Sequence, residues 1–327
     1  MAVLAPDSTT DEARASQSPS RKVGDDLGLR AGASAVLMAA ALAAAWAGGF
    51  LFLALWLLAA GAVLWEWQKL VGGERFAARV VLGGLTLCAT GLGLFEWQRL
   101  IDGERPLARL EIDGLTLVAE AMPPLHSPVA AWTLTTLAVG AVATGAVAGG
   151  QRDARVWAGA GVVYAGALVA APTLLRASPA YGLAAILWLY AVVWGTDTMA
   201  YFAGRLIGGP KLWRYVSPGK TWAGALVGAL AGASCGAIVG PLAAPDGARF
   251  GPLLGLGLAA SVVAQLGDLF ESAVKRRFRV KDSGRLIPGH GGMMDRLDGF
   301  VAAATFAALV AWWRSSGEWI AGGLFKW

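Results

Sequence analysis

Charged residues are scarce in this chain, and histidine and cysteine are scarcer still. Only 15% of the 327 residues are charged, which is too little to cover the surface of a soluble protein of this length. The two cysteines cannot build a disulfide framework, and with only two histidines the composition also argues against a zinc site. The net charge of +5 is concentrated in two loops, which favours an anionic partner at a membrane surface over a nucleic acid.

Long apolar segments fill most of the remaining sequence. Hydrophobic residues make up 56% of the chain, and the mean hydropathy is +0.56. Because ~20 apolar residues cross the hydrocarbon core as a helix, the chain is predicted to be an all-α, polytopic integral membrane protein with about nine transmembrane helices. The candidate spans are 32–47, 49–66, 77–95, 129–149, 156–176, 181–203, 222–243, 251–274 and 297–314.

The sequence divides into three regions. Residues 1–30 are polar and nearly free of aromatic side chains, so we expect a disordered cytoplasmic tail. Residues 31–150 form an N-terminal transmembrane region, and residues 151–327 form a C-terminal transmembrane region that carries the catalytic candidates. Basic residues gather in the loops after the sixth and eighth spans. Two spans separate these loops, so both are expected on the same, cytoplasmic side, which in a bacterial cell means the inner membrane.

Two features of the spans call for separate interpretations. The segment 64–87 recurs as 94–117 with fourteen of twenty-four residues identical, but the second copy has gained Pro106, Glu111 and Asp113. We therefore expect the second copy at the membrane interface or outside the bilayer.

The span 222–243 carries a glycine at every fourth residue from Gly224 to Gly240. Close packing within the chain is the simpler interpretation of this stripe, and a homodimer interface is the alternative.

Carboxylates lie at the ends of two neighbouring spans. Asp268 and Ser272 share a helix face near the end of the eighth span, and Asp295 and Asp298 share a face at the start of the ninth. Charges at such depth are costly and usually functional. Oxygen ligands at the same level suit Mg²⁺, which takes one or two carboxylates together with waters and substrate phosphates. An ion pair between helices is the alternative for Asp268.

Basic residues surround these carboxylates and favour a polyphosphate ligand. They are Lys275, Arg276, Lys281, Arg285 and Arg296. His290 lies in the glycine-rich loop "PGHGG", where it could hydrogen-bond phosphate or shuttle a proton. An ordinary histidine in a turn is the alternative.

A second anion site is predicted before the seventh span. Ser217, Lys220 and Thr221 precede a helix, where hydroxyls, free amides and a lysine bind anions. An ordinary N-cap explains the same residues equally well. Asp197 of the sixth span shares a helix face with Arg205, which follows the span, and this is more than packing requires.

The run from Ser272 to Asp298 resembles the phosphatidate cytidylyltransferase family, also called CDP-diacylglycerol synthase. The family pattern S-x-x-K-R-x4-K-D-x5-P-x-H-G-G-x-x-D-R-x-D is matched by Ser272, Lys275, Arg276, Lys281, Asp282, Pro288, His290, Gly291, Gly292, Asp295, Arg296 and Asp298. "QLGDLFES", "DTMAYFAGRLIG" and "SPGKTW" also look like the family, and "WEWQKL" is a weaker similarity. The chain departs from the pattern at Ala223, where the family usually has glutamate.

The resemblance implies transfer of a cytidylyl group from CTP to phosphatidic acid in the bilayer, giving CDP-diacylglycerol and pyrophosphate. On this interpretation Asp268 and Asp295 hold Mg²⁺, and Lys281, Arg285 and Arg296 bind phosphatidate or pyrophosphate. The nucleotide phosphates would be bound by Ser217, Lys220 and Thr221. The remaining candidates are His290 and Asp298 among catalytic residues, and Asp197, Arg205, Ser272, Lys275, Arg276 and Asp282 in substrate binding. The alternatives are a CTP-dependent lipid kinase and a secondary transporter that uses intramembrane aspartates.

Overall fold

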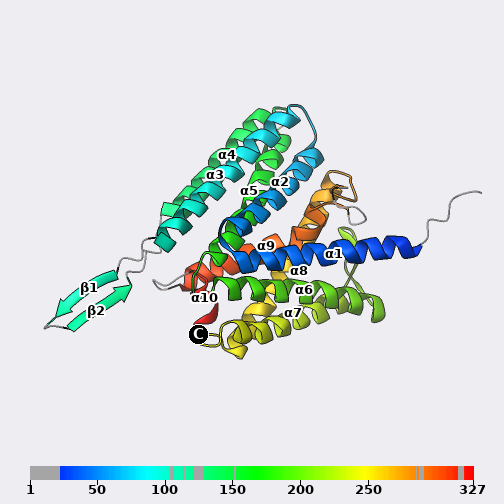
Figure 1. The fold of residues 1–327 in the computed structure, drawn as a ribbon. Helices are drawn as coiled ribbons and strands as arrows, with labels where there is room; N and C mark the ends of the chain where they lie inside the picture. Colours follow the sequence, from blue (N-terminus) through cyan, green and yellow to red (C-terminus); the bar gives the residue numbers. More distant parts are fainter. Residues whose placement is uncertain are drawn as a thin grey trace, which may run out of the picture.

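The computed structural model describes residues 23–103, 107–112, 115–120, 128–150, 152–284, 286, 291–315 and 320–327. Ten helices lie in these ranges (Figure 1): α1 (Val23–Ala47), α2 (Gly49–Val71), α3 (Phe76–Gly103), α4 (Pro128–Ala148), α5 (Arg152–Arg176), α6 (Gly182–Leu206), α7 (Trp222–Ala243), α8 (Phe250–Arg277), α9 (Met294–Arg314) and the short α10 (Gly322–Phe325). Two hairpins accompany them: β1 (Leu107–Ile112) with β2 (Leu115–Glu120), and β3 (Lys211–Trp213) with β4 (Ser217–Thr221).

The predicted all-α, polytopic membrane class is confirmed, whereas the count of nine spans is not. Among the described residues, seven helices are long and apolar enough to cross a membrane, namely α2 to α8. The apolar part of α1 is only Gly32–Ala47. Helix α9 is not one of the seven; it carries Asp295, Arg296 and Asp298 in its first turns and ends at Arg314. The short hairpins were not predicted.

The predicted disordered tail is too long at its C-terminal end. Residues 23–30 form the first two turns of α1 instead of an extended polar segment. The rest of the predicted tail, residues 1–22, lies outside the described residues.

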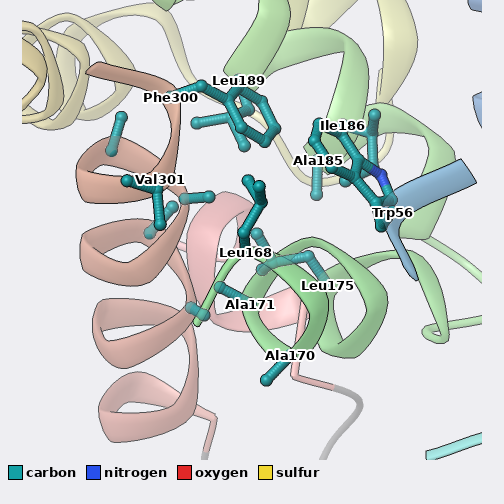
Figure 2. Packing of buried hydrophobic residues seen from close by; sticks show 14 of the residues in the cluster. Trp56, Leu168, Ala170, Ala171, Leu175, Ala185, Ile186, Leu189, Phe300 and Val301 are labelled. Carbon is teal, nitrogen blue, oxygen red and sulfur yellow. The ribbon is translucent and has the colours of Figure 1, made fainter. Parts of the chain in front are cut away.

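Helix α9 joins two groups of helices. Helices α2, α3, α4 and α5 pack side by side in one group, while α6, α7 and α8 pack in sequence in the other (Figure 1). Helix α9 packs against both α5 and α8. Figure 2 shows Phe300 and Val301 of α9 next to buried side chains of α5 and α6, such as Leu168 and Leu189. The ring of Phe300 stacks on Trp56 of α2, with 4.6 Å between ring centroids.

The two copies of the repeat adopt different structures. The first copy, 64–87, spans the end of α2 and the beginning of α3. The second copy, 94–117, begins at the end of α3 and continues into β1 and the start of β2. This agrees with the expectation that the second copy does not form a span. Its position relative to the bilayer remains a prediction, and Pro106 lies outside the described residues.

The glycine stripe of α7 packs within the chain, as the simpler interpretation predicted. A Cβ atom on Gly228 would lie 2.7 Å from the carbonyl oxygen of Thr196, and one on Gly224 would lie 2.8 Å from that of Ala200. Both contacts are to the backbone of α6, so any side chain on this face would force the two helices apart. Close approach of α6 and α7 brings Asp197 and Arg205 next to the β3–β4 hairpin, which directly precedes α7.

Substitution Gly228→Ala should therefore lower the thermal unfolding temperature, because overpacking a helix contact costs about 1–3 kcal/mol. Gly255→Ala in α8 is the matched control, since a Cβ atom there meets nothing within 4 Å. Equal unfolding temperatures for the two variants in detergent micelles would contradict the close α6–α7 contact.

Candidate active site

A charged cleft of about 760 Å³ lies between α6, the β3–β4 hairpin, α7, α8 and the start of α9. Four carboxylates and three basic side chains from these elements line it. Eight of the predicted site residues contribute to this lining: Asp197, Arg205, Lys220, Thr221, Asp268, Asp295, Arg296 and Asp298. Residues from positions 197 to 298 of the chain thus meet in one place.

Helix α6 supplies one wall of the cleft. Asp197, Tyr201 and Arg205 follow one another at intervals of four residues, so they project from the same face. All three line the cleft, and the Arg205 guanidinium donates a hydrogen bond to the Tyr201 hydroxyl. This contact holds Arg205 at the cleft without neutralising its positive charge, because the tyrosine hydroxyl is uncharged.

The β3–β4 hairpin supplies the second wall. Thr221 ends β4 and is the N-cap of α7, where its hydroxyl accepts a hydrogen bond of 3.1 Å from the backbone amide of Gly224. The N-cap interpretation of the "SPGKT" segment is thereby confirmed. The cap also fixes Lys220, one residue earlier, at the edge of the cleft. Ser217 lies at the other end of β4 and does not line the cleft.

Two lysines compensate the carboxylates on α8 and α9. The Lys220 ammonium lies 2.7 Å from Oδ2 of Asp268, which links the hairpin to α8. Lys275 lies 2.7 Å from the fully buried Glu271 and 2.8 Å from Asp295, which links α8 to α9. An ion pair to Asp268 is thus present, but it joins the hairpin to α8 and not two helices, as the alternative had expected.

Asp295 lies in the first turn of α9, before the apolar part of that helix. Burial opposes its charged form, but hydrogen bonds with Glu271, Lys275 and the Gly292 amide outweigh burial and hold the pKa of Asp295 at about 2. The side chain is therefore a carboxylate throughout the physiological pH range. It is held in place from both α8 and the preceding loop.

An apolar groove of about 760 Å³ lies beside the charged cleft. It is formed by α5, α8 and α9 together with Trp67 of α2, and its lining includes Val163, Leu266, Phe270, Val301 and Leu309. Asp298 lines both the groove and the charged cleft. The two hollows therefore meet at this carboxylate.

The donor set of the cleft fits Mg²⁺, provided that the substrate completes the coordination. Carboxylate oxygens are the ligands that this cation takes, and it usually retains waters and substrate phosphates. Within the described ranges, no three His, Cys, Asp or Glu side chains lie close enough to form a complete metal site. Asp268 and Asp295 therefore stay the predicted ligands, in a site that needs further oxygens.

Those of the remaining predicted residues that the structure describes lie outside the cleft lining. Lys281 and Asp282 are exposed after α8, and Ser272 is partly buried within that helix. The Arg276 guanidinium lies 3.5 Å from the carbonyl oxygen of Val216 in the hairpin. Arg285 and His290 lie outside the described residues. The roles assigned to these residues and to Ser217 stay predictions.

Two residues of this region received no role from the sequence analysis. Gln265 lines the cleft and donates a hydrogen bond of 3.1 Å to the carbonyl oxygen of Ala225. Glu66, in the segment "WEWQKL", is fully buried against the loop before α9. Glu66 could have been singled out because its carboxylate follows the long apolar run of α2. The nearly identical segment around Glu96 obscured it.

Comparison with known proteins places the chain in a family. The sequence model described as "Cytidylyltransferase family" matches residues 29–313, which is most of the chain. The chain belongs to the cytidylyltransferase family. The family match includes every cleft residue and the apolar groove, so the resemblance identified from the motifs around Asp295 extends to the whole bundle.

Curated relatives give the same result over shorter segments. The phosphatidate cytidylyltransferase of Brucella abortus is 46% identical over 158 residues, which is 48% of this chain and 58% of the relative. The phosphatidate cytidylyltransferase of Staphylococcus aureus is 48% identical over 120 residues, which is 37% of this chain and 46% of the relative. The chain therefore matches about half of the length of these relatives.

The Lys275 bridge yields a stability prediction. Lys275→Met should lower the free energy of unfolding by about 3–5 kcal/mol, because it removes the cation that lies between the buried acidic groups of Glu271 and Asp295. Adding Glu271→Gln should restore part of the loss. Arg277→Met is the control, since Arg277 pairs with Asp153 at an exposed position. Thermal unfolding of the three variants tests this prediction. Equal losses of stability in Lys275→Met and Arg277→Met would refute the bridge.

Proposed function

We propose that this protein transfers a cytidylyl group from CTP to phosphatidic acid, with CDP-diacylglycerol and pyrophosphate as products. The observation that carries the proposal is the junction at Asp298, where a charged cleft meets an apolar groove. A lipid with a phosphate headgroup and acyl chains requires both surfaces at once. The names of the curated relatives and the family match support the same reaction.

The reaction requires little proton transfer by the protein. A phosphatidate oxygen attacks the α-phosphorus of CTP, the new oxygen–phosphorus bond forms, and the bond from the α-phosphorus to the bridging oxygen breaks. Pyrophosphate leaves with the electron pair of that bond. Because the phosphate monoester is already an anion, no strong general base is needed. Catalysis then depends on alignment and on neutralising negative charge.

The basic residues of the cleft are suited to this task. Lys220 and Thr221 would bind the nucleotide phosphates from the hairpin side, with Ser217 further along β4. Arg296, at the start of α9, would bind phosphatidate or pyrophosphate. Lys220 already forms an ion pair with Asp268, so it can exchange that carboxylate for a nucleotide phosphate without leaving the cleft.

A divalent cation fits the same arrangement. Asp268 and Asp295 would hold Mg²⁺ together with phosphate oxygens of the nucleotide. The bound ion would neutralise negative charge on the α-phosphate of the transferred cytidylyl group and on the leaving pyrophosphate. Lys220 and Lys275 lie 2.7 and 2.8 Å from these two carboxylates and hold them in place.

Basic residues near the cleft also support a proposed orientation in the membrane. Arg276 contacts the β3–β4 hairpin, and Arg277 contacts Asp153 at the start of α5. The basic ends of these elements therefore lie at one end of the bundle, as the sequence analysis expected. We place this end at the cytoplasmic face of the bacterial inner membrane, where CTP is supplied from the cytosol. A homodimer stays a prediction.

Pyrophosphate release by the purified protein in mixed micelles tests the proposal. Release should require CTP and phosphatidate together, should not be supported by ATP, and should stop reversibly with EDTA. CDP-diacylglycerol should accumulate in equal amount. Absence of the lipid product, or equal rates with ATP and CTP, would refute the proposed reaction. Full activity in excess EDTA would refute the role of the metal.

Lys220→Ala extends this assay to the cleft. It should raise the KM for CTP about tenfold or more, which corresponds to about 1.4 kcal/mol of lost phosphate binding. Lys211→Ala is the matched control, because this exposed lysine lies on the same hairpin but outside the cleft lining. An unchanged KM for CTP with a raised KM for phosphatidate would assign Lys220 to the lipid instead.

A further inference from the structure

Glu66 is a carboxylate in the last turns of α2 and is fully buried, with an exposed fraction of 0%. Burying a carboxylate is costly unless hydrogen bonds or positive charge compensate it. None of the steps described above uses this side chain. Its partners therefore indicate what it contributes.

The partners of Glu66 belong to the beginning of α9 and the loop before it. The backbone amide of Met293 donates to Oε1 at 3.0 Å, and that of Met294 donates to Oε2 at 2.8 Å. The Ser283 hydroxyl also donates to Oε2, at 3.1 Å. The first amides of a helix have no partner inside it, and they form its positive end. Glu66 therefore caps α9 from a different helix.

Two glycines leave room for this contact. A Cβ atom on Gly284 would overlap Oε1 of Glu66, and one on Gly292 would lie 2.8 Å from Oε2. A side chain at either position would push the carboxylate away from the amides that donate to it. The loop backbone and Glu66 thus pack directly against each other at both described ends of the loop.

The first turns of α9 carry the cleft residues Asp295, Arg296 and Asp298. The Gly292 amide also donates to Asp295 at 3.1 Å, so the segment that Glu66 holds is itself bonded to the cleft. We propose that Glu66 is a positioning residue, which fixes the start of α9 so that Asp295 and Asp298 are aligned for reaction. The inference rests on the proposed function and assigns to α2 a part in it.

The repeat provides a matched control within the chain. Glu96 occupies the position in "FEWQRL" that Glu66 occupies in "WEWQKL". Its side chain is 58% exposed and pairs only locally among the described contacts, with Arg99 at 3.2 Å. The two glutamates share their sequence context and differ in what they contact. Comparing their variants separates the contact with α9 from the effect of losing a charge.

The experiment compares Glu66→Gln with Glu96→Gln in the full-length protein in mixed micelles. A glutamine at position 66 places an NH₂ group against one of the two backbone amides. Glu66→Gln should lower kcat at least tenfold, because Asp295 and Asp298 at the start of α9 lose their alignment. Hydrogen exchange should become faster in peptides that contain Met293 and Met294, and should be unchanged in α6. Glu96→Gln should behave as wild type.

A wild-type kcat together with wild-type hydrogen exchange in Glu66→Gln would overturn the inference. Hydrogen exchange that becomes faster to the same extent in α6 and α9 would also overturn it. If Glu66→Gln does not purify, Ser283→Ala removes one of the three donors and should give a smaller loss of kcat with faster exchange at the start of α9. Unchanged exchange in Ser283→Ala would then overturn the inference. A wild-type protein that makes no CDP-diacylglycerol would count against the proposed function alone, because the exchange measurement tests the contact independently.

Discussion

Compensation of buried negative charge organises the C-terminal half of this protein. Carboxylates in an apolar bundle require cations or hydrogen-bond donors close by. Lys220 meets Asp268 across the hairpin and α8, and Lys275 meets both Glu271 and Asp295 across α8 and α9. Each of these contacts joins elements that surround the cleft, so the charges of the candidate site also hold the walls of the cleft together.

The second organising feature is the position of α9. This helix packs against both helix groups, carries three cleft residues in its first turns, and forms one side of the apolar groove. Its beginning is bonded to Glu66 of α2 and its middle stacks on Trp56 of the same helix. One helix thus connects the charged cleft, the groove and the N-terminal half, which is the arrangement that an amphipathic substrate needs.

Local spacing in the sequence predicted much of this site. Residues three or four apart on a helix share a face, so the amino-acid sequence alone was enough to pair Asp295 with Asp298 and Asp197 with Arg205. The spans of α2 to α8 followed from hydropathy in the same way. The N-cap at Thr221 followed from its position before an apolar run.

Contacts between distant segments could not be predicted in this way. Lys220 and Asp268 are 48 residues apart, and Glu66 and Met294 are 228 apart, so no local pattern connects them. The repeat made Glu66 and Glu96 look equivalent, and only the packing of α2 against the loop before α9 distinguishes them. The β3–β4 hairpin was missed because β3 has three residues, too few for an alternating pattern.

The central claim is that the charged cleft and the apolar groove bind one lipid molecule. Val163 lines the groove and is 48% exposed, so Val163→Trp fills the groove without entering the core. The decisive measurement is the KM of this variant for long-chain phosphatidate and for CTP, with the exposed Val142→Trp of α4 as control. The account predicts a KM for phosphatidate raised several-fold, an unchanged KM for CTP, and no effect in the control. Unchanged KM values for both substrates in Val163→Trp would contradict it.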